Sequence, residues 1–205
     1  MGKLYAIIGP SGSGKSTIGQ YVFGKENELV STTTRPMRRN ELNGKHYHFI
    51  DKDKFLFKMS LDKFAEMDFY DGNYYGLTHD EIYDKTNDGD AYVVITRHGY
   101  QQLKSLYPDI VSVFIDASKE HVEAMLRGRN DSNIEKRLEL YESETQQKQF
   151  CDYVIHNEFG NMEKAVFQLL CLKNGEMDKF EELQRGNSKQ SSEEVEIDGW
   201  DFNMD

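Results

Sequence analysis

The strongest constraint on the fold of this chain is a glycine-rich run at residues 9–16. It reads Gly-Pro-Ser-Gly-Ser-Gly-Lys-Ser and matches the P-loop pattern G-x-x-x-x-G-K-[ST] at every position. The run follows an apolar segment at 4–8 and precedes a segment at 15–23 whose apolar residues have helical spacing. Glycines in such a turn let backbone N–H groups face phosphate oxygens, and the helix adds the positive end of its dipole. The sequence therefore predicts a phosphate-binding turn between a buried strand and a helix.

Two side chains at the end of this turn have predicted roles in binding a nucleoside triphosphate. Lys15 would contact the β- and γ-phosphates, and the Ser16 hydroxyl would be a ligand of Mg²⁺. The predicted ATP-binding residues of the run are Gly9, Pro10, Ser11, Gly12, Ser13, Gly14, Lys15, Ser16 and Thr17. A glycine-rich turn that matches by chance is the alternative, and the flanking strand and helix argue against it. A P-loop alone does not identify the second substrate.

Apolar runs and helical patterns alternate along the rest of the chain. We expect strands at 29–34, 47–50, 91–96, 110–115 and 153–155, and an aromatic hairpin around the Asp-Gly turn at 71–72. Helices are predicted after the capping residues Asp51, Thr78 and Ser118, and at 134–148 and 162–170. Strands that alternate with helices indicate an α/β fold, here a three-layer α/β/α P-loop NTPase with a parallel sheet.

Charge and length limit the class of protein further. A chain of 205 residues suits one α/β domain. Residues 175–205 hold ten acidic and three basic residues, and so carry −7 of the net charge of −11. The remainder is mildly acidic and lacks the basic stripe of a nucleic-acid-binding protein. Residues 186–205 are rich in Ser, Gln, Asn and acidic side chains, and we predict a disordered tail there.

Cysteine usage and hydropathy indicate a reducing, aqueous compartment. Cys151 and Cys171 lie in apolar stretches without C-x-x-C spacing, so we interpret them as free buried thiols rather than a disulfide or a zinc site. The first residues form neither a signal peptide nor a myristoylation signal. No apolar run approaches the roughly 20 residues of a membrane span. We expect a cytoplasmic protein that binds neither a membrane nor a nucleic acid.

A second group of basic residues follows the P-loop. Residues 31–39 read S-T-T-T-R-P-M-R-R, and residues 41–47 read E-L-N-G-K-H-Y. Arginine offers a planar fork that fits phosphate oxygens, and tyrosine adds a neutral donor. Most basic clusters of this kind are only solvated surface. Beside a P-loop, however, a second phosphate site is what a nucleoside monophosphate kinase needs.

These motifs, in this order and spacing, resemble those of guanylate kinases. The resemblance runs from about residue 3 to 172 and includes S-x-T-T-R-x-x-R at 31–38, N-G-x-x-Y at 43–47 and G-N-Y-Y-G at 72–76. It implies transfer of the γ-phosphoryl group of ATP to GMP or dGMP, with Mg²⁺ as cofactor. It also implies one domain at 1–185, made of a parallel core, a small α+β GMP-binding insertion at about 31–90 and a lid at about 125–140.

The resemblance also assigns roles to individual residues. The residues implied to bind GMP, through its phosphate or its guanine, are Ser31, Arg35, Arg38, Tyr47, Glu66, Tyr75 and Thr96. Ser31 and Glu66 would face the guanine, and Thr96 stands where the family has an acidic guanine-binding residue. Asn157 matches an asparagine near the adenine of ATP. The implied catalytic residues are Lys15, Arg38, Arg129 and Arg137, of which the last two match lid arginines that surround the transferred phosphoryl group.

Glu66 has a chemical rationale of its own. Guanine presents N1–H and N2–H₂ as adjacent donors, and an ionised carboxylate accepts a hydrogen bond from both. Adenine has an acceptor at N1, which the same carboxylate repels. Polar sites of this kind discriminate by a factor of about 10⁴ or more, because the wrong base leaves polar groups unpaired. The alternative is that Glu66 is a surface charge beside the hairpin.

Several positions depart from the family pattern. Val94-Ile95-Thr96 stands where the family has D-x-D, so an acidic guanine-binding residue and an acid close to the metal are both absent. Leu77 replaces a family serine or threonine, with Thr78 adjacent, and Met125 replaces a lid arginine, with Arg127 two positions on. The segment between the two lid arginines is also shorter than expected. Compared with the family pattern, the set of phosphate-binding residues is thus nearly complete, whereas the set of residues that would recognise the base is partly changed.

Three functions remain open at the level of sequence. The first is an active guanylate kinase with an adjusted base pocket. The second is a kinase on the same scaffold with another phosphorylated acceptor, an unusual nucleotide or a ribose bisphosphate, although Glu66 favours GMP over a sugar without a base. The third is a non-catalytic guanylate-kinase-like binding module of the kind found in scaffold proteins. The intact P-loop and the lack of room for a partner domain argue against this third function.

Overall fold

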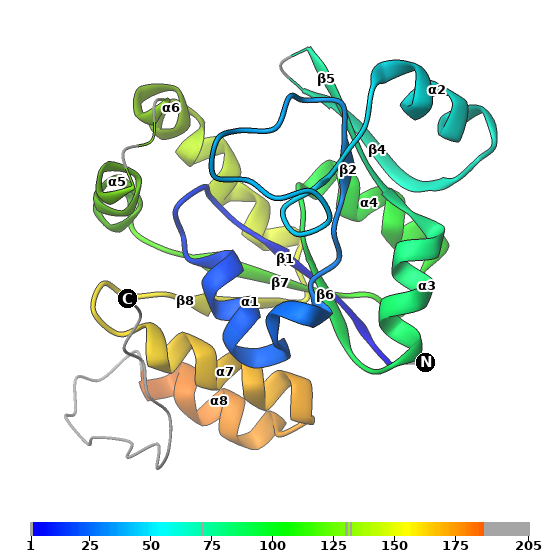
Figure 1. Ribbon diagram of the computed structural model, residues 1–205. Coiled ribbons are helices and arrows are strands. Elements are labelled where there is room, and N and C mark those ends of the chain that lie inside the picture. The colour runs from blue at the N-terminus through cyan, green and yellow to red at the C-terminus, as the bar shows by residue number, and fades with distance from the viewer. Residues whose placement is uncertain (1, 71, 130, 132, 187–205) are drawn as a thin grey trace.

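The core of the protein is a four-stranded parallel sheet in the order β6-β1-β7-β8 (Figure 1). The computed structural model describes residues 2–70, 72–129, 131 and 133–186. The core strands are β1 (Leu4–Ile8), β6 (Ala91–Val94), β7 (Val111–Asp116) and β8 (Tyr153–His156). A second, mixed sheet in the order β3-β2-β5-β4 consists of β2 (Thr32–Thr33), β3 (His48–Phe49), β4 (Phe64–Tyr70) and β5 (Asn73–Thr78).

Helices surround both sheets and confirm the expected three-layer α/β/α class. In the described part of the chain they are α1 (Lys15–Phe23), α2 (Lys52–Ser60), α3 (His79–Asn87), α4 (Arg97–Leu106), α5 (Lys119–Gly128), α6 (Ile134–Thr145), α7 (Met162–Asn174) and α8 (Met177–Gly186). Two short 3₁₀ turns cover Lys25–Asn27 and Gln146–Phe150. None of the described helices is long and apolar enough to cross a membrane.

Strand β1 lies at the centre of the core sheet and is buried on both faces. All five of its residues are buried, which explains why it is apolar throughout rather than alternating. Tyr5 and Ile7 face a hydrophobic cluster built with α1, α7 and α8. Leu4, Ala6 and Ile8 face the opposite cluster, which includes residues of α4 and of the second sheet. The two clusters give the molecule its layers.

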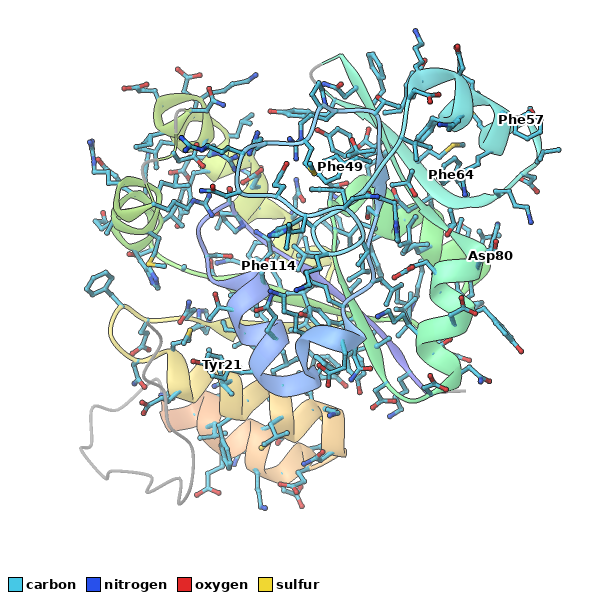
Figure 2. The ribbon with its side chains drawn as sticks, viewed as in Figure 1. Tyr21, Phe49, Phe57, Phe64, Asp80 and Phe114 are labelled. Carbon is cyan, nitrogen blue, oxygen red and sulfur yellow. The ribbon has the colours of Figure 1, made fainter. Side chains whose placement is uncertain are left out.

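The second sheet packs onto the core sheet through shared hydrophobic contacts. Ala65 of β4, Leu77 of β5 and Ile82 of α3 belong to the same buried cluster as Phe114 of β7. Phe114 lies between the layers, whereas Phe57 of α2 points outward at the far end of the second sheet (Figure 2). The predicted insertion at 31–90 contains this whole sheet with α2 and α3, and it is packed against the core.

The segment predicted as one strand at 29–34 belongs to two different sheets. Glu28 bridges Tyr92 of β6, and the backbone N–H of Leu29 donates to the Tyr92 carbonyl at 2.8 Å. Two residues later Thr32 and Thr33 pair with β3 and β5 of the second sheet. The prediction of one continuous strand was therefore wrong. The β-branched composition was interpreted correctly, but local composition does not show which sheet supplies each partner.

The predicted helix caps at Asp51, Thr78 and Ser118 are confirmed. Each side chain accepts a hydrogen bond from a backbone N–H in the first turn of its helix. Glu81, three residues after Thr78, contacts a different part of the chain, because its Oε1 accepts from the backbone N–H of Val30 at 2.9 Å. Glu81 therefore ties α3 to the segment that joins the two sheets.

Helices α4 and α8 were not predicted from sequence. The buried residues of α4 are Gly99, Tyr100 and Leu103, a short apolar pattern that begins with a poor helix former. In α8 only Phe180 is buried, among acidic and polar neighbours. This helix is described as far as Gly186, and the rest of the predicted tail at 186–205 lies outside the described residues.

Helix α4 is fastened to β4 by one amide side chain, and this contact generates a stability prediction. Gln102 Oε1 accepts from the backbone N–H of Met67 at 3.0 Å, and its Nε2 donates to the Met67 carbonyl at 2.8 Å. Replacing Gln102 with alanine should lower the free energy of unfolding by about 1–3 kcal/mol, because two part-buried backbone groups lose their partner. Denaturant titration measures the change. The neighbouring exposed Gln101→Ala is the matched control and should stay within about 0.5 kcal/mol of wild type. Equal effects of the two substitutions would contradict this assignment.

Candidate active site

The candidate site lies at the carboxyl edge of the core sheet, where parallel α/β sheets bind their ligands. Strand β1 ends directly at the glycine-rich run, which continues into α1. Gly14 precedes this helix in the left-handed region, with φ of 91°, and no side chain among the described residues caps the helix. The N–H groups at the start of α1 are therefore available to an anion. The structure thus has the strand, turn and helix that a working P-loop requires.

Lys15 lies in the first turn of α1 and folds back over the P-loop. Its Nζ donates to the carbonyl oxygens of Gly9 and Pro10 at 2.8 and 2.6 Å. Burial lowers the pKa of Lys15 to about 8. The carboxylate of Glu144 on α6 acts to raise this pKa, whereas the charges of the nearby arginines lower it further. The ammonium form still dominates at neutral pH, and phosphate groups beside it would stabilise that form further.

Asn157, predicted to lie near adenine, contacts the P-loop backbone. It follows β8, is 3% exposed, and its Nδ2 donates to the carbonyl oxygen of Ser13 at 2.9 Å. A Cβ atom on Gly14 would come within 2.6 Å of this amide, so glycine is required there for close packing as well as for its backbone conformation. Asn157 therefore supports the P-loop from beneath, and its contact with adenine stays a prediction.

A cleft of about 310 Å³ lies between the P-loop and α5. Its lining residues are Gly12, Gly14, Ser16, Thr17, Ala124, Met125, Gly128 and Arg129. Four of these were predicted to bind ATP, so the structure places a concave surface beside them. Met125, which stands at the position of a family arginine, makes the α5 wall of this cleft less polar. Arg127 does not take the place of that arginine, because it forms an ion pair with Glu123 on the same helix at 2.6 Å.

Both predicted lid arginines reach the P-loop. Arg129 follows α5 and its Nη2 donates to Ser11 Oγ at 3.3 Å, and Arg137 in α6 also donates to Ser11 Oγ through Nη1. Asp131, which no motif indicated, forms ion pairs with both of them. The structure thus brings together Ser11, Lys15, Arg129 and Arg137 although 126 residues separate the first from the last.

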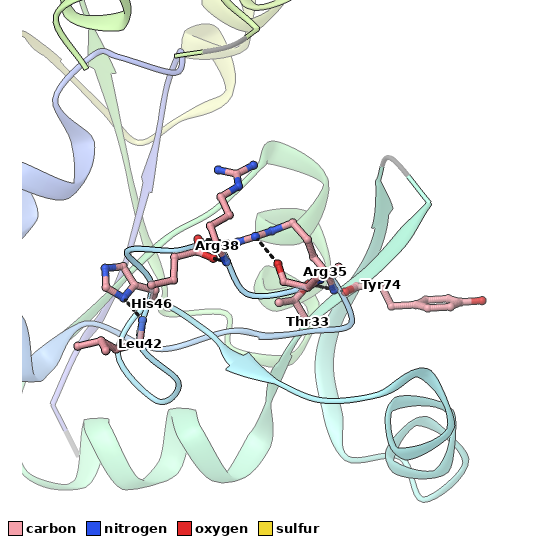
Figure 3. A network of polar contacts seen from close by, with 8 residues as sticks. Thr33, Arg35, Arg38, Leu42, His46 and Tyr74 are labelled. Atoms are coloured by element: carbon pink, nitrogen blue, oxygen red, sulfur yellow. Dashed lines mark hydrogen bonds and ion pairs between the residues drawn. The ribbon is translucent and has the colours of Figure 1, made fainter. Parts of the chain in front are cut away.

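The loop after β2 forms a separate cationic site (Figure 3). Arg35 pairs with Glu41 at 2.6 Å, and the second oxygen of Glu41 accepts from the backbone N–H of Arg38 at 2.8 Å. The Arg38 guanidinium extends outward from the loop in Figure 3 and forms no hydrogen bond or ion pair with another described residue. One carboxylate therefore holds Arg35 and shapes the loop, while Arg38 remains available to an anion.

Two tyrosines complete this second site. The Arg35 guanidinium lies 5.5 Å from the centroid of the Tyr47 ring, and Tyr47 packs edge-on against Tyr75 at 5.9 Å. Burial raises the pKa of Tyr47, so its phenol stays protonated and can act as a hydrogen-bond donor. The structure therefore brings together Arg35 of the loop, Tyr47 directly before β3 and Tyr75 of β5, and their role in binding a phosphate stays a prediction.

Glu66, the predicted guanine-binding residue, is a buried carboxylate in β4. It is 7% exposed and lies opposite Leu77 of β5. Burial raises the pKa of Glu66 to about 7, and the nearby charge of Asp68 makes a smaller contribution in the same direction. A hydrogen bond from the Leu77 backbone partly offsets this rise. A Cβ atom on Gly99 would lie 2.9 Å from Glu66 Oε2, so the missing side chain in the first turn of α4 leaves room for the carboxylate.

Thr96 and Ser31, the two other residues predicted to contact the base, form backbone or capping hydrogen bonds within the protein. Thr96 is exposed and caps α4 by accepting from the backbone N–H of Gly99 at 3.2 Å, which brings its hydroxyl close to the turn that Glu66 touches. Ser31 precedes β2, and its carbonyl accepts from the backbone N–H of His48. Leu77 is fully buried and has no hydroxyl, and the Thr78 hydroxyl accepts the capping hydrogen bond of α3.

The donor set fits a metal ion that arrives with a nucleotide. Ser16 is exposed at the mouth of the cleft. Among the described residues no group of three or more His, Cys, Asp or Glu side chains could hold a metal ion. A single hydroxyl does not bind Mg²⁺ unaided, whereas Mg²⁺ in nucleotide sites takes most of its ligands from phosphates and water. Ser16 is therefore suited to complete the coordination of a Mg²⁺–ATP complex.

Sequence patterns had not indicated three acidic residues of the site. Glu41 holds Arg35, Asp131 holds Arg129 and Arg137, and Glu144 faces Lys15. The chain contains 36 acidic residues, and nothing in the sequence distinguishes these three from the others. Glu41 could have been considered, since it lies within the loop of basic residues. The other two depend on how α6 packs.

Fold and site together define a P-loop phosphotransferase with a separate cationic site in the loop after β2. A model of the guanylate kinase family matches residues 1–171. The chain is 36% identical over 179 residues to a guanylate kinase of Paraburkholderia xenovorans, covering 83% of this chain and 79% of that protein. It is 33% identical over 188 residues to a guanylate kinase of Colwellia psychrerythraea, covering 85% of each. A crystal structure of guanylate kinase from Anaplasma phagocytophilum superposes with a TM-score of 0.67 and 25% identity, over 85% of this chain and 86% of that one. The chain belongs to the guanylate kinase family.

The raised pKa of Glu66 predicts a pH-dependent stability. The folded protein holds this proton more tightly than the unfolded chain, whose carboxyl has the ordinary pKa of 4.5. The contribution to the free energy of unfolding is therefore complete below pH 4.5 and is lost as the pH rises through about 7. Urea unfolding at several pH values should show a steeper fall for wild type than for Glu66→Gln across this range. Glu123→Gln, at an exposed carboxylate, should follow wild type. Parallel curves for wild type and Glu66→Gln would show that Glu66 does not titrate in this range.

Proposed function

We propose that this protein transfers the γ-phosphoryl group of ATP to GMP or dGMP and produces ADP and the nucleoside diphosphate. One observation carries the choice of a guanine nucleotide. Glu66 is buried and forms no ion pair within the described residues, although a buried carboxylate is costly without a partner. Guanine supplies two adjacent N–H donors that satisfy an ionised carboxylate. The similarity to the guanylate kinases named above supports the same assignment.

The reaction needs no covalent intermediate with the protein. A phosphate oxygen of the acceptor attacks the γ-phosphorus in line, and the bond from that phosphorus to the oxygen bridging it to the β-phosphate breaks. Lys15, Arg129 and Arg137 offset the negative charge that spreads over the transferred group. Arg35 and Arg38, with Tyr47 and Tyr75, hold the acceptor phosphate so that its oxygen points at the P-loop.

The cofactor we propose is Mg²⁺ bound to ATP, with Ser16 as its protein ligand. When bound, the ion would neutralise charge on the β- and γ-phosphates. Closure of α5 and α6 over the P-loop would exclude water, which could otherwise accept the phosphoryl group. The free thiols of Cys151 and Cys171 are consistent with a reducing compartment, and we propose the cytoplasm.

The acceptor-phosphate site can be tested with three neighbouring arginines. Arg35→Ala and Arg38→Ala should each raise the KM for GMP and lower kcat, with kcat/KM reduced at least about tenfold, because each fork both binds and orients the phosphate. Arg39→Ala removes an exposed arginine from the same loop and should leave both constants near wild type. Steady-state assays at saturating ATP give the comparison. If the KM for GMP is unchanged in Arg35→Ala and Arg38→Ala, these arginines do not bind the acceptor and are only solvent-exposed surface residues.

The base pocket is tested with a panel of nucleoside monophosphates. Wild type should prefer GMP and dGMP to IMP, AMP and UMP in kcat/KM. Glu66→Gln should reduce the preference for GMP over AMP by about 10- to 100-fold, since an amide offers one acceptor to two donors and loses the charge. Thr96→Asp should lower the KM for GMP, because aspartate still caps α4 and its second oxygen can accept from the base.

The outcomes of this panel separate the alternatives. If the wild-type protein does not phosphorylate GMP but phosphorylates another acceptor, the guanine assignment is wrong and that acceptor is the substrate. Wild type that binds GMP and phosphorylates nothing would make the protein a binding module.

A further inference from the structure

Asp131 joins the two lid arginines at the junction of α5 and α6. Its Oδ1 accepts from Arg137 Nε at 3.1 Å and from the backbone N–H of Asn133 at 3.0 Å. Its Oδ2 lies 3.3 Å from Arg129 Nη2. The backbone N–H of Asp131 donates to the carbonyl of Leu126 at 3.1 Å, so the last turn of α5 holds the carboxylate in place.

The arginines held by this carboxylate meet at one atom of the P-loop. Arg129 Nη2 and Arg137 Nη1 both donate to Ser11 Oγ. Two guanidinium groups at a single neutral oxygen repel each other, and a carboxylate shared between them offsets that repulsion. Asp131 thus lets both positive charges approach the phosphate-binding turn together.

Burial indicates that this carboxylate is a built part of the lid rather than a chance surface contact. The Asp131 side chain is 14% exposed, whereas that of Arg129 is 51% exposed. Burial by itself would raise the pKa of Asp131, but the backbone hydrogen bond from Asn133 and the charges of the two arginines lower it. The group therefore keeps its negative charge at neutral pH.

A small hydrophobic core packs α5 against α6. Val122 and Leu126 of α5 pack with Tyr141 of α6, and the Tyr141 hydroxyl donates to the Ala117 carbonyl at 2.7 Å. This packing fixes the two helices relative to each other. It leaves the orientation of the long arginine side chains to be set by polar contacts, since each has several freely rotating bonds.

We propose that Asp131 is a positioning residue for phosphoryl transfer, which holds Arg129 and Arg137 as one pair aimed at the P-loop. The inference rests on the proposed function and extends it to a residue that contacts neither substrate. Asp131 acts through the arginines. Its effect should therefore be seen mainly in kcat, and it should disappear where the arginines no longer contribute.

A double-mutant cycle with Arg137 tests this dependence. Asp131→Ala should lower kcat about tenfold or more, with the KM for GMP within about threefold of wild type, because misplaced charge affects the transition state more than acceptor binding. The same substitution in an Arg137→Ala background should change kcat by less than about threefold. Glu123→Ala is the matched control, since it removes the exposed partner of Arg127 on the same lid and should leave kcat unchanged.

Three results would overturn the proposal. They are an unchanged kcat in Asp131→Ala, equal losses in the two backgrounds, and a loss confined to the KM for GMP. If thermal unfolding shows that the alanine variant is not folded, Asp131→Asn takes its place in the cycle. Asparagine keeps an oxygen for Arg137 Nε and Asn133 N–H but loses the charge, so non-additivity is again expected.

The proposed function could be wrong while the positioning role of Asp131 is right. A binding measurement tests the positioning role independently of GMP phosphorylation. Wild type that does not phosphorylate GMP rejects the proposed function alone. Calorimetric titration with ADP and with a non-hydrolysable ATP analogue, each with Mg²⁺, then gives the result. Asp131→Ala should weaken binding of the ATP analogue more than binding of ADP, because the paired arginines act on the terminal phosphate. Equal weakening of both ligands, or none, would overturn the positioning role.

Discussion

Strand β1 is buried on both faces, and this burial sets the places of the helical layer, the second sheet and the P-loop. Tyr5 and Ile7 pack against the layer formed by α1, α7 and α8. Leu4, Ala6 and Ile8 pack against the opposite layer, formed by α4 and the second sheet. A strand held on both faces ends at a defined place, and the P-loop begins there. Asn157, at the end of β8, then supports the loop through the Ser13 carbonyl. The core sheet therefore sets the position of the P-loop.

The same burial positions the acceptor site. Leu77 and Ala65 of the second sheet share a hydrophobic cluster with the core strands, so the sheet that holds Glu66 and Tyr75 cannot be displaced without exposing that cluster. Gln102 and Glu81 add polar ties from α4 and α3. The lid differs, because its own small core gives it shape while its contacts with the P-loop are polar. A further contact places Lys136 Nζ of α6 5.6 Å from the Tyr70 ring at the tip of β4, so lid and second sheet also touch each other.

Carboxylates lie beside several of the cations of this site. Glu41, Asp131 and Glu144 each face an arginine or lysine that we assign to a phosphate. A carboxylate behind a cation keeps it oriented and charged in partly buried surroundings, where desolvation would otherwise disfavour it. Glu66 is the exception, since it is buried without a cation among the described residues. That difference separates the residue assigned to a neutral base from those assigned to phosphates.

Features that depend on residues close together along the chain could be predicted from the sequence. The strand at Leu4–Ile8, the P-loop and the caps at Asp51, Thr78 and Ser118 were predictable because each pattern is complete within a few residues. The gathering of Arg35, Tyr47 and Tyr75 was predictable only through the resemblance to a known family. Tertiary structure alone decided the division of residues 28–33 between two sheets, the use of Glu81 to hold Val30, and the pairing of Asp131 with two arginines. In each of these a polar group had several chemically equivalent partners, and only the packing of distant apolar surfaces selected one of them.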